Sequence, residues 1–199
     1  MIEIIDISKD KPYQIFQNYY DAALIAKQRS IDAISISSFN ADSNEVESRY
    51  VNLKYIIDNE WTFFSHYESP KALDFLGHDQ ISTLFYWQNI NVQIRLKCKI
   101  FKSSANFSDK HFDKRTIEKN ALTISSSQSK VIQSYSDVKD SYNKTLLKID
   151  KNTVRPNNWG GFTFIPYYFE FWEGHENRLN KRHVFEQYKK KWEERLLQP

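Results

Sequence analysis

The spacing of apolar residues predicts one helix near the N-terminus and then a series of strands. Five residues recur at helical intervals within 12–28: Ile15, Tyr19, Ala22, Ala23 and Ala26. Residues 33–39 and 46–55 then read as strands on either side of a polar turn at 40–45, which is typical of a hairpin. Further strands are predicted at 61–65, 81–87, 92–101 and 161–172, and a last short strand or turn near Trp192.

The clearest alternation lies in residues 92–101. Five apolar residues (Val92, Ile94, Leu96, Cys98 and Ile100) alternate with four polar ones (Gln93, Arg95, Lys97 and Lys99). This two-residue period predicts a strand with one buried and one polar face. Cys98 lies on the apolar face, where a cysteine most often acts as a small hydrophobic residue.

Three more helices interrupt the strands. Ser69 and Pro70 are typical of a helix N-cap and first position, and Gly77 is a natural end for that helix. Residues 108–124 and 134–149 also read as helices. Sequential strands with short turns indicate an antiparallel sheet that closes, or nearly closes, into a barrel with the helices outside. The predicted fold class is therefore mainly β with peripheral helices (α+β).

Composition limits the class of protein. The chain has 199 residues, 40% of them hydrophobic, which favours one globular domain over residues 1–199. A net charge of +3 is too small to indicate nucleic-acid binding. Cys98 is the only cysteine, so a reducing compartment is expected. Residues 1–6 lack the features of a signal peptide and no apolar run is long enough to span a membrane, so we expect a cytoplasmic protein.

Several common kinds of site are excluded. Only four glycines occur, and their positions rule out a phosphate-binding P-loop and the usual dinucleotide motif. The five histidines show no metal-ligand spacing, so no metal is expected, and no Ser-His-Asp arrangement stands out.

What remains is a set of basic, amide and aromatic residues at the ends of elements. Lys71 follows a helix start, where backbone N–H groups favour an anion. Trp172 precedes Arg178 and Arg182, and a flat ring beside guanidinium groups suits a planar anionic ligand. Taken singly, each is equally compatible with an ordinary core or surface residue.

In order and spacing, these motifs match one family. They are the strand motif 49–54, the pair Phe64-Ser65 followed by Ser69 to Ala72, Trp87 with Gln93, Gln128-Ser129, Trp159-Gly160-Gly161, Glu170-Phe171-Trp172, Arg178-Leu179 with Arg182, and the end at 195–199. Through them residues 33–199 resemble the pyridoxamine 5′-phosphate oxidases, which are FMN enzymes of pyridoxine biosynthesis.

The resemblance implies an antiparallel Greek-key split β-barrel that forms a homodimer with FMN at the subunit interface. Residues 1–30 would form an N-terminal helical arm and 159–199 a dimerisation and site segment. One subunit would hold FMN through Arg49, Lys54, Phe64, Ser65 and Lys71. The other would contribute Gln93, Gln128, Ser129, Trp172 and Arg182. Arg49 and Lys54 are five residues apart, so a regular strand would point them to opposite faces unless a bulge intervenes or one side chain reaches around.

The implied substrate site departs from the family pattern. Its phosphate would be bound by Lys54, His111, Arg115 and Lys119, where His111 replaces a tyrosine and Lys119 a serine. Arg178 and Asn180 would cover the substrate ring, with Asn180 in place of a histidine. On the flavin side, Pro70 and Val92 each replace an arginine. No residue is assigned a catalytic acid–base role, because positioning is the main task of the protein in flavin oxidation.

Three functions follow from this pattern. The first is an FMN-dependent oxidase acting on pyridoxamine or pyridoxine 5′-phosphate with O₂ as acceptor. The second is an oxidase of the same fold with another substrate, as in the phenazine-biosynthesis relatives. The third is a non-catalytic protein that binds flavin or pyridoxal phosphate.

Overall fold

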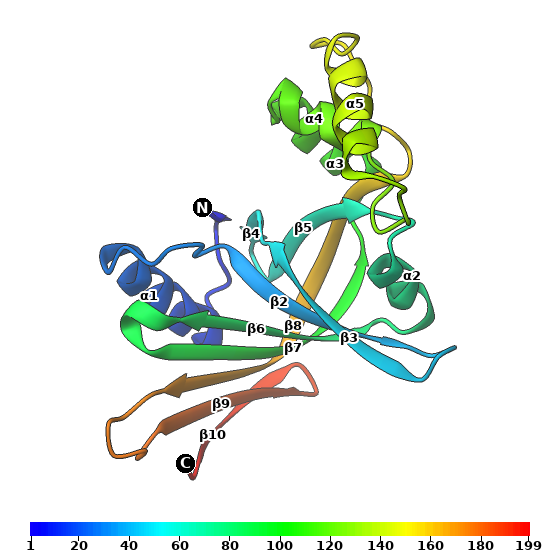
Figure 1. The fold of residues 1–199 in the computed structure, drawn as a ribbon. Coiled ribbons are helices and arrows are strands. Elements are labelled where there is room, and N and C mark those ends of the chain that lie inside the picture. The colour runs from blue at the N-terminus through cyan, green and yellow to red at the C-terminus, as the bar shows by residue number, and fades with distance from the viewer. The chain divides into compact units, whose positions relative to one another are not determined.

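The computed structural model describes residues 1–199 and contains ten strands and five α-helices in a mostly β arrangement (Figure 1). The strands are β1 (Glu3–Ile5), β2 (Ala33–Asn40), β3 (Glu45–Asn52), β4 (Tyr55–Ile57), β5 (Glu60–His66), β6 (Gln80–Trp87), β7 (Val92–Lys102), β8 (Trp159–Glu173), β9 (Lys181–Tyr188) and β10 (Lys191–Leu197). The helices are α1 (Lys11–Ile25), α2 (Pro70–Gly77), α3 (Ala105–Lys114), α4 (Ile117–Ser125) and α5 (Tyr135–Leu146). None of them is long and apolar enough to cross a membrane.

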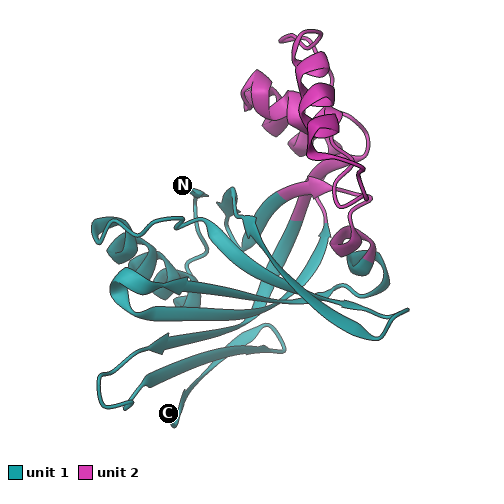
Figure 2. Cartoon of the chain, viewed as in Figure 1, with its two compact units in different colours: residues 1–63, 74–101, 163–199 teal, residues 64–73, 102–162 magenta.

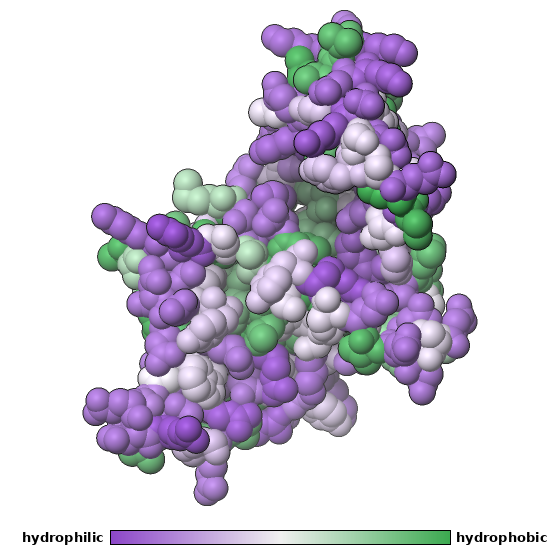
Figure 3. Space-filling view, viewed as in Figure 1, coloured by the Kyte–Doolittle hydropathy of each residue, from purple (hydrophilic) through white to green (hydrophobic).

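The chain forms two compact units (Figure 2). Unit 1 comprises residues 1–63, 74–101 and 163–199, and unit 2 comprises residues 64–73 and 102–162. Hydrophilic residues cover most of the visible surface of both units, and hydrophobic ones form smaller patches (Figure 3). The assignment of residues 1–199 to one domain, with an arm at 1–30 and a dimerisation segment at 159–199, stays a prediction.

The core of unit 1 is an aromatic cluster beneath α1. The ring of Phe16 on this helix lies 4.4 Å from Trp61 and 5.7 Å from both Phe85 and Trp87. All four side chains are buried, and aromatic rings at such distances add packing energy beyond their buried area. The predicted helix at 12–28 is confirmed, although it ends at Ile25 because the chain turns at Lys27, which has a φ of 55°.

The alternation at 92–101 is also confirmed. β7 pairs antiparallel with β6, from Gln80 opposite Lys99 to Trp87 opposite Val92. Every second residue from Val92 to Ile100 is buried, including Cys98, whose side chain is fully enclosed. Burial raises the pKa of the Cys98 thiol well above its ordinary value, which makes it an inert core residue.

The sheet was predicted to close, or nearly close, into a barrel, and the structure shows it open. The strand order is β1-β4-β5-β8-β7-β6-β2-β3, with β9 and β10 attached through β8, and the sheet does not close. It is also mixed, because β1 pairs in parallel with β4 through Glu3 and Tyr55. The three residues of β1 are too few to reveal an alternating pattern.

The C-terminal segment forms a full hairpin where a short strand or turn was expected. β9 and β10 pair over seven positions, and the tight turn between them uses positive φ angles at Lys189 and Lys190. The sequence shows no glycine or asparagine at this turn, and most β10 side chains are exposed. The usual hairpin signals are therefore missing.

The predicted strand at 46–55 is divided into β3 and β4. β3 pairs with β2 up to Asn52, after which the Leu53 N–H donates to Asp32 O and the Lys54 N–H to Thr62 O, each at 2.8 Å. The chain thus changes its partner strand between Arg49 and Lys54. Strand alternation does not continue across this change, so the five-residue spacing does not by itself place the side chains of Arg49 and Lys54 on opposite faces.

Unit 2 contains α3, α4 and α5. The predicted helix at 108–124 is two helices, because Arg115 takes extended backbone angles (φ −78°, ψ 157°). α3 begins at the N-cap Ser104, and α5 at a capping box formed by Ser134 and Asp137. Arg115 is thereby placed at the junction of two helices rather than along one of them.

Candidate functional site

Aromatic rings in unit 2 form a stack where β5, α3 and β8 meet. The Phe64 ring centroid lies 3.7 Å from that of His111, 5.3 Å from that of Trp159 and 6.2 Å from that of Phe107, with interplanar angles of 12–19°. We call these four residues the aromatic stack. Gly160 permits the close packing beside it, since an added Cβ would lie 2.8 Å from Tyr67 Cζ and 2.9 Å from Ser108 Oγ.

Arg115 rests on this stack without an acidic partner. Its guanidinium carbon lies 4.5 Å from the Trp159 ring centre, and its nitrogens donate to Thr123 Oγ1 at 2.8 Å and Lys119 O at 2.9 Å. Burial lowers the pKa of Arg115 to about 10. A half-buried cation that contacts only neutral groups is well suited to bind an anionic ligand.

A second cation of unit 2 is Lys71, at the start of α2. Its side chain is buried and its ammonium donates to Ser69 Oγ at 3.2 Å. The nearby His66 is also buried, and its pKa is lowered first by burial and then by the charge of Lys71. Glu68 opposes this effect, and Arg115 lowers the pKa further by a smaller amount. The pKa shift of His66 thus reflects burial first and the adjacent ammonium of Lys71 second.

The charge of the whole unit agrees with this local picture. Unit 2 has 12 Lys and Arg residues against 7 Asp and Glu, a net charge of +5, whereas the whole chain has +3. The surplus of positive charge therefore lies in unit 2, which favours an anionic ligand there.

Ser65 and Gln128 lie together in unit 2. The Ser65 hydroxyl donates to Gln128 Oε1 at 3.0 Å, and the His66 N–H donates to the same oxygen at 3.2 Å. The 126–134 loop thus returns to the end of β5 within one chain, and the assignment of Ser65 and Gln128 to opposite subunits of a dimer stays a prediction. The neighbouring Ser129 has a φ of 68° and forms the turn of that loop.

The predicted residues Arg49, Lys54 and Gln93 lie in unit 1. Arg49 donates to Ser38 Oγ at 2.5 Å and to Glu47 at 2.7 Å, and Lys54 forms an ion pair of 3.1 Å with Asp32. Gln93 is half-buried on the polar face of β7. Both cations thus have partners within the chain and are already oriented before any ligand binds.

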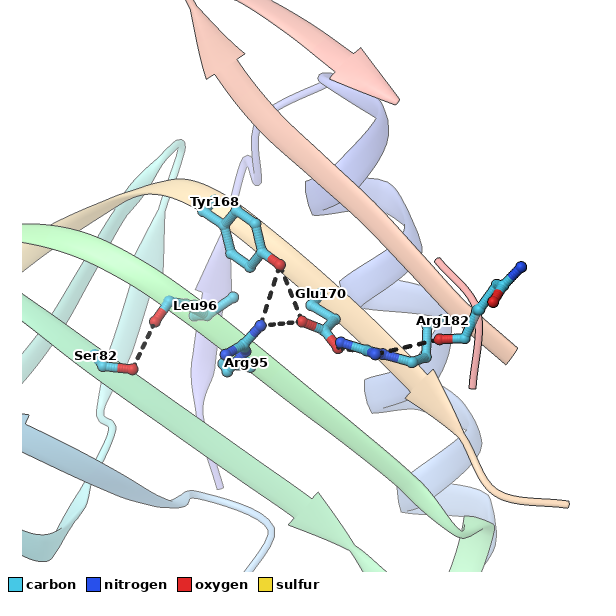
Figure 4. Close-up of polar contacts among 7 residues, drawn as sticks. Ser82, Arg95, Leu96, Tyr168, Glu170 and Arg182 are labelled. Carbon is cyan, nitrogen blue, oxygen red and sulfur yellow. Dashed lines mark hydrogen bonds and ion pairs between the residues drawn. The ribbon is translucent and has the colours of Figure 1, made fainter. Parts of the chain in front are cut away.

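Trp172 and Arg182 face each other across β8 and β9 in unit 1. The Arg182 side chain is bound to Glu170, which also contacts Arg95 and Tyr168 (Figure 4). No role toward a ligand was predicted for Glu170, Tyr168 or Arg95. The signal that could have found them is a glutamate inside the apolar run 162–172, since such a buried carboxylate needs a cationic partner.

The remaining substrate candidates differ in their surroundings. Arg178 is exposed in the turn after β8, with a φ of 60°, and the Asn180 side-chain oxygen accepts from the His175 N–H at 3.0 Å. Lys119 is exposed on α4, and its carbonyl rather than its ammonium contacts Arg115. No group of three or more His, Cys, Asp or Glu residues is arranged to hold a metal ion.

Comparison with known proteins connects this geometry to one family. Residues 159–199 match the pyridoxine 5′-phosphate oxidase C-terminal dimerisation region. A pyridoxine/pyridoxamine 5′-phosphate oxidase of Cupriavidus necator is 31% identical over 180 residues, which cover 90% of this chain and 84% of that protein.

Solved structures show the same fold. PhzG from Burkholderia lata, in complex with tetrahydrophenazine-1-carboxylic acid, has a TM-score of 0.89 at 23% identity and covers 94% of this chain and 92% of its own. An FMN-binding protein from Nostoc punctiforme, related to pyridoxamine 5′-phosphate oxidase, has a TM-score of 0.75 at 10% identity over 96% and 99% of the two chains. The open sheet is thus a split barrel. Identity with the Cupriavidus protein over most of both chains shows that this chain belongs to the pyridoxine/pyridoxamine 5′-phosphate oxidase family.

Proposed function

We propose that this protein is an FMN-dependent oxidase that converts pyridoxamine or pyridoxine 5′-phosphate to pyridoxal 5′-phosphate with O₂ as acceptor. The observation that carries the proposal is Arg115, a half-buried cation that contacts only neutral groups beside an aromatic stack. A phosphorylated aromatic substrate supplies both the missing negative charge and a flat ring. The names of the relatives support the same chemistry.

The residues present fit FMN. FMN carries a phosphate dianion and a planar ring, and unit 2 offers the buried Lys71 at the N-terminal end of α2 beside the hydroxyl of Ser69. When bound, FMN would supply the redox chemistry, in which the substrate loses two electrons and O₂ is reduced. The residues that would hold FMN are Arg49, Lys54, Phe64, Ser65, Lys71, Gln93, Gln128, Ser129, Trp172 and Arg182.

The substrate phosphate would be bound by Arg115 with His111, Lys119 and Lys54. Arg115 would supply the fixed charge, because the Trp159 ring and the Thr123 hydroxyl already orient its guanidinium. His111 is held flat against Phe64 and would offer a ring nitrogen as donor. Arg178 and Asn180 would cover the pyridine ring.

The protein would work as a homodimer with FMN at the subunit interface. This proposal rests on the match of residues 159–199 to a dimerisation region. These residues contain the β9–β10 hairpin and the proposed flavin residue Arg182.

A second function is an oxidase of the same fold with a different substrate. The observation that favours it is the altered substrate set, in which Asn180 is bound within its own turn and His111 is stacked on a ring. The likeness in fold to PhzG is compatible with this function as well. Binding of flavin or pyridoxal phosphate without turnover is the third possibility.

One experiment tests the first function against the other two. The protein is reconstituted with FMN, oxygen is removed, and pyridoxine 5′-phosphate or unphosphorylated pyridoxine is added while the visible spectrum is recorded. The proposal requires the flavin band to bleach with the phosphorylated compound, and its colour to return with air. A flavin that stays oxidised with both compounds would refute it and leave the other two functions.

A further inference from the structure

Glu170 is a buried carboxylate held by two arginines and a tyrosine in unit 1 (Figure 4). One of its oxygens, Oε2, accepts from Arg95 Nη2 and, at 2.9 Å, from the Tyr168 hydroxyl. The other, Oε1, accepts from Arg182 Nε at 2.9 Å and lies 2.8 Å from Arg182 Nη2. The carboxylate is only 3% exposed, so these four contacts replace the water that it lost on folding.

The strand register explains why Glu170 reaches Arg182. In the β8–β9 pairing Trp172 lies directly opposite Arg182, and Glu170 opposite Val184. Glu170 and Trp172 are two residues apart on β8, so they share one face, and Glu170 is the diagonal neighbour of Arg182. The spacing of the Glu-Phe-Trp motif thus places a carboxylate beside the arginine.

The guanidinium of Arg182 is fixed on two sides. Nε and Nη2 contact Glu170, and Nη1 donates to the Gln198 carbonyl at 3.2 Å, near the C-terminus. Three of its five N–H groups are thereby used, which leaves two for a ligand. A guanidinium held at three nitrogens has one orientation, whereas a free arginine side chain has many.

The group keeps a positive charge. Two arginines and one carboxylate sum to +1, because Tyr168 stays neutral. Burial, and then its hydrogen bond to Glu170, raises the pKa of Tyr168. Burial alone would raise the pKa of Glu170, but the hydrogen bonds from Arg182, Arg95 and Tyr168 outweigh burial and hold that pKa below its ordinary value.

We propose that Glu170 is a positioning residue of the flavin site, which fixes the guanidinium of Arg182 in the orientation that FMN requires. This inference rests on the proposed function, because the role of Arg182 toward FMN belongs to that function. In this view Tyr168 and Arg95 hold the carboxylate, and the carboxylate in turn holds Arg182.

A purely electrostatic role of Glu170 and a positioning role predict opposite changes in FMN binding when Glu170 is replaced. Replacing Glu170 by glutamine raises the charge of the group from +1 to +2, which by attraction alone would tighten the binding of anionic FMN. If Glu170 acts by orienting Arg182, the same change weakens FMN binding despite the added charge.

The test measures the Kd of FMN by quenching of flavin fluorescence, together with the thermal unfolding of the FMN-free protein. We expect Glu170→Gln to raise the Kd on the order of tenfold, as when the outer partner of a ligand-binding side chain is removed. The control is Glu173→Gln on the same strand, which breaks the ion pair with Lys181 and should leave the Kd unchanged. An equal rise in the control variant would overturn the assignment.

A double-mutant cycle tests whether Glu170 acts through Arg182. In an Arg182→Gln background, Glu170→Gln should have no further effect on the Kd. An undiminished effect in that background would overturn the proposal, as would an unchanged or lower Kd in the single variant. If Glu170→Gln fails to fold, Tyr168→Phe removes two hydrogen bonds, to Glu170 and from Arg95, and no charge. It should still raise the Kd about two- to threefold. An unchanged Kd in that folded variant would also refute the proposal. Failure of the wild-type protein to bind FMN would instead reject the proposed function.

Discussion

Replacing Arg115 by alanine should separate substrate binding from folding more cleanly than any other change in unit 2. In the unliganded protein this guanidinium contacts a ring, a hydroxyl and a carbonyl, but no carboxylate. Its charge is therefore only partly compensated until an anion binds. The same side chain should contribute little to stability and much to the recognition of phosphate.

The two contributions can be estimated from the structure. Burial lowers the pKa of Arg115 to about 10, which corresponds to about 3 kcal/mol against the charged form, reduced to about 2 because the side chain is partly exposed to water. Two hydrogen bonds at about 1 kcal/mol each, plus about 0.5 kcal/mol from the Trp159 ring, oppose this cost. The net contribution of Arg115 to the free energy of unfolding is thus below about 1 kcal/mol.

Binding should change far more. Loss of a charged, hydrogen-bonded partner of the phosphate costs about 3 kcal/mol, or roughly a hundredfold in kcat/KM. The assay compares kcat/KM for pyridoxine 5′-phosphate in the wild type, Arg115→Ala and the control Lys114→Ala, which removes an exposed charge next to it. Urea unfolding of the FMN-free proteins measures stability. Unchanged activity in Arg115→Ala, or a stability loss above about 3 kcal/mol, would refute this reasoning.

Three further predictions use other parts of the structure. The pKa of His66 should rise toward 6.5 when inorganic phosphate binds, because the anion offsets the charges of its cationic neighbours. An NMR titration that shows no rise would contradict the proposed phosphate site. Glu170 has a lowered folded-state pKa, so the unfolded chain takes up its proton first on acidification. Its stabilising effect is then lost below about pH 4.5. Urea unfolding at acid pH should therefore show that the free energy of unfolding falls less steeply with decreasing pH in Glu170→Gln than in wild type. An equal pH dependence in the two proteins would argue against the pairing. Gly160→Ala should destabilise the protein by about 1–3 kcal/mol, because the added Cβ would meet two side chains. The control Gly77→Ala should not destabilise it, because nothing lies within 4 Å of that position. Equal urea midpoints in the two variants would disprove the close packing.

The sequence predicted those elements whose two faces meet different surroundings. The strand at 92–101 and the helix at 12–28 were found because one side of each is buried and the other is not. The three-residue β1 was missed because it is too short for a pattern, and β10 was predicted only as a short strand or turn near Trp192 because it has no buried face. The division of 108–124 into two helices was also missed, because the break falls at Arg115 and Thr116, and neither is a proline or glycine that would mark it.

The site residues could be predicted only where the local sequence marks them. Residues with a special backbone or charge context, such as Lys71 at a helix start, could be selected from the sequence. A glutamate in an apolar run marks Glu170 as a residue that needs a cation, but its partners could not be predicted, because they depend on the pairing of β8 with β9 and on Arg95 from a third strand. Contacts between strands distant in sequence are set by register, which local patterns do not specify.

The substrate positions that depart from the family pattern lie on helices and in a turn, unlike the flavin-side departure Val92, which is buried on β7. Asn180 is in an exposed turn, Lys119 is on the outer side of α4, and His111 is on one turn of α3. The proposed flavin cations Arg49 and Arg182 instead lie on strands and are tied to other strands by hydrogen bonds or ion pairs. A substitution at those two positions leaves a partner on another strand without its hydrogen bond, whereas the hydrogen bond of Asn180 lies within its own turn. Under the proposed function, this arrangement would let the substrate change at helices and turns while the strands keep the proposed flavin cations Arg49 and Arg182.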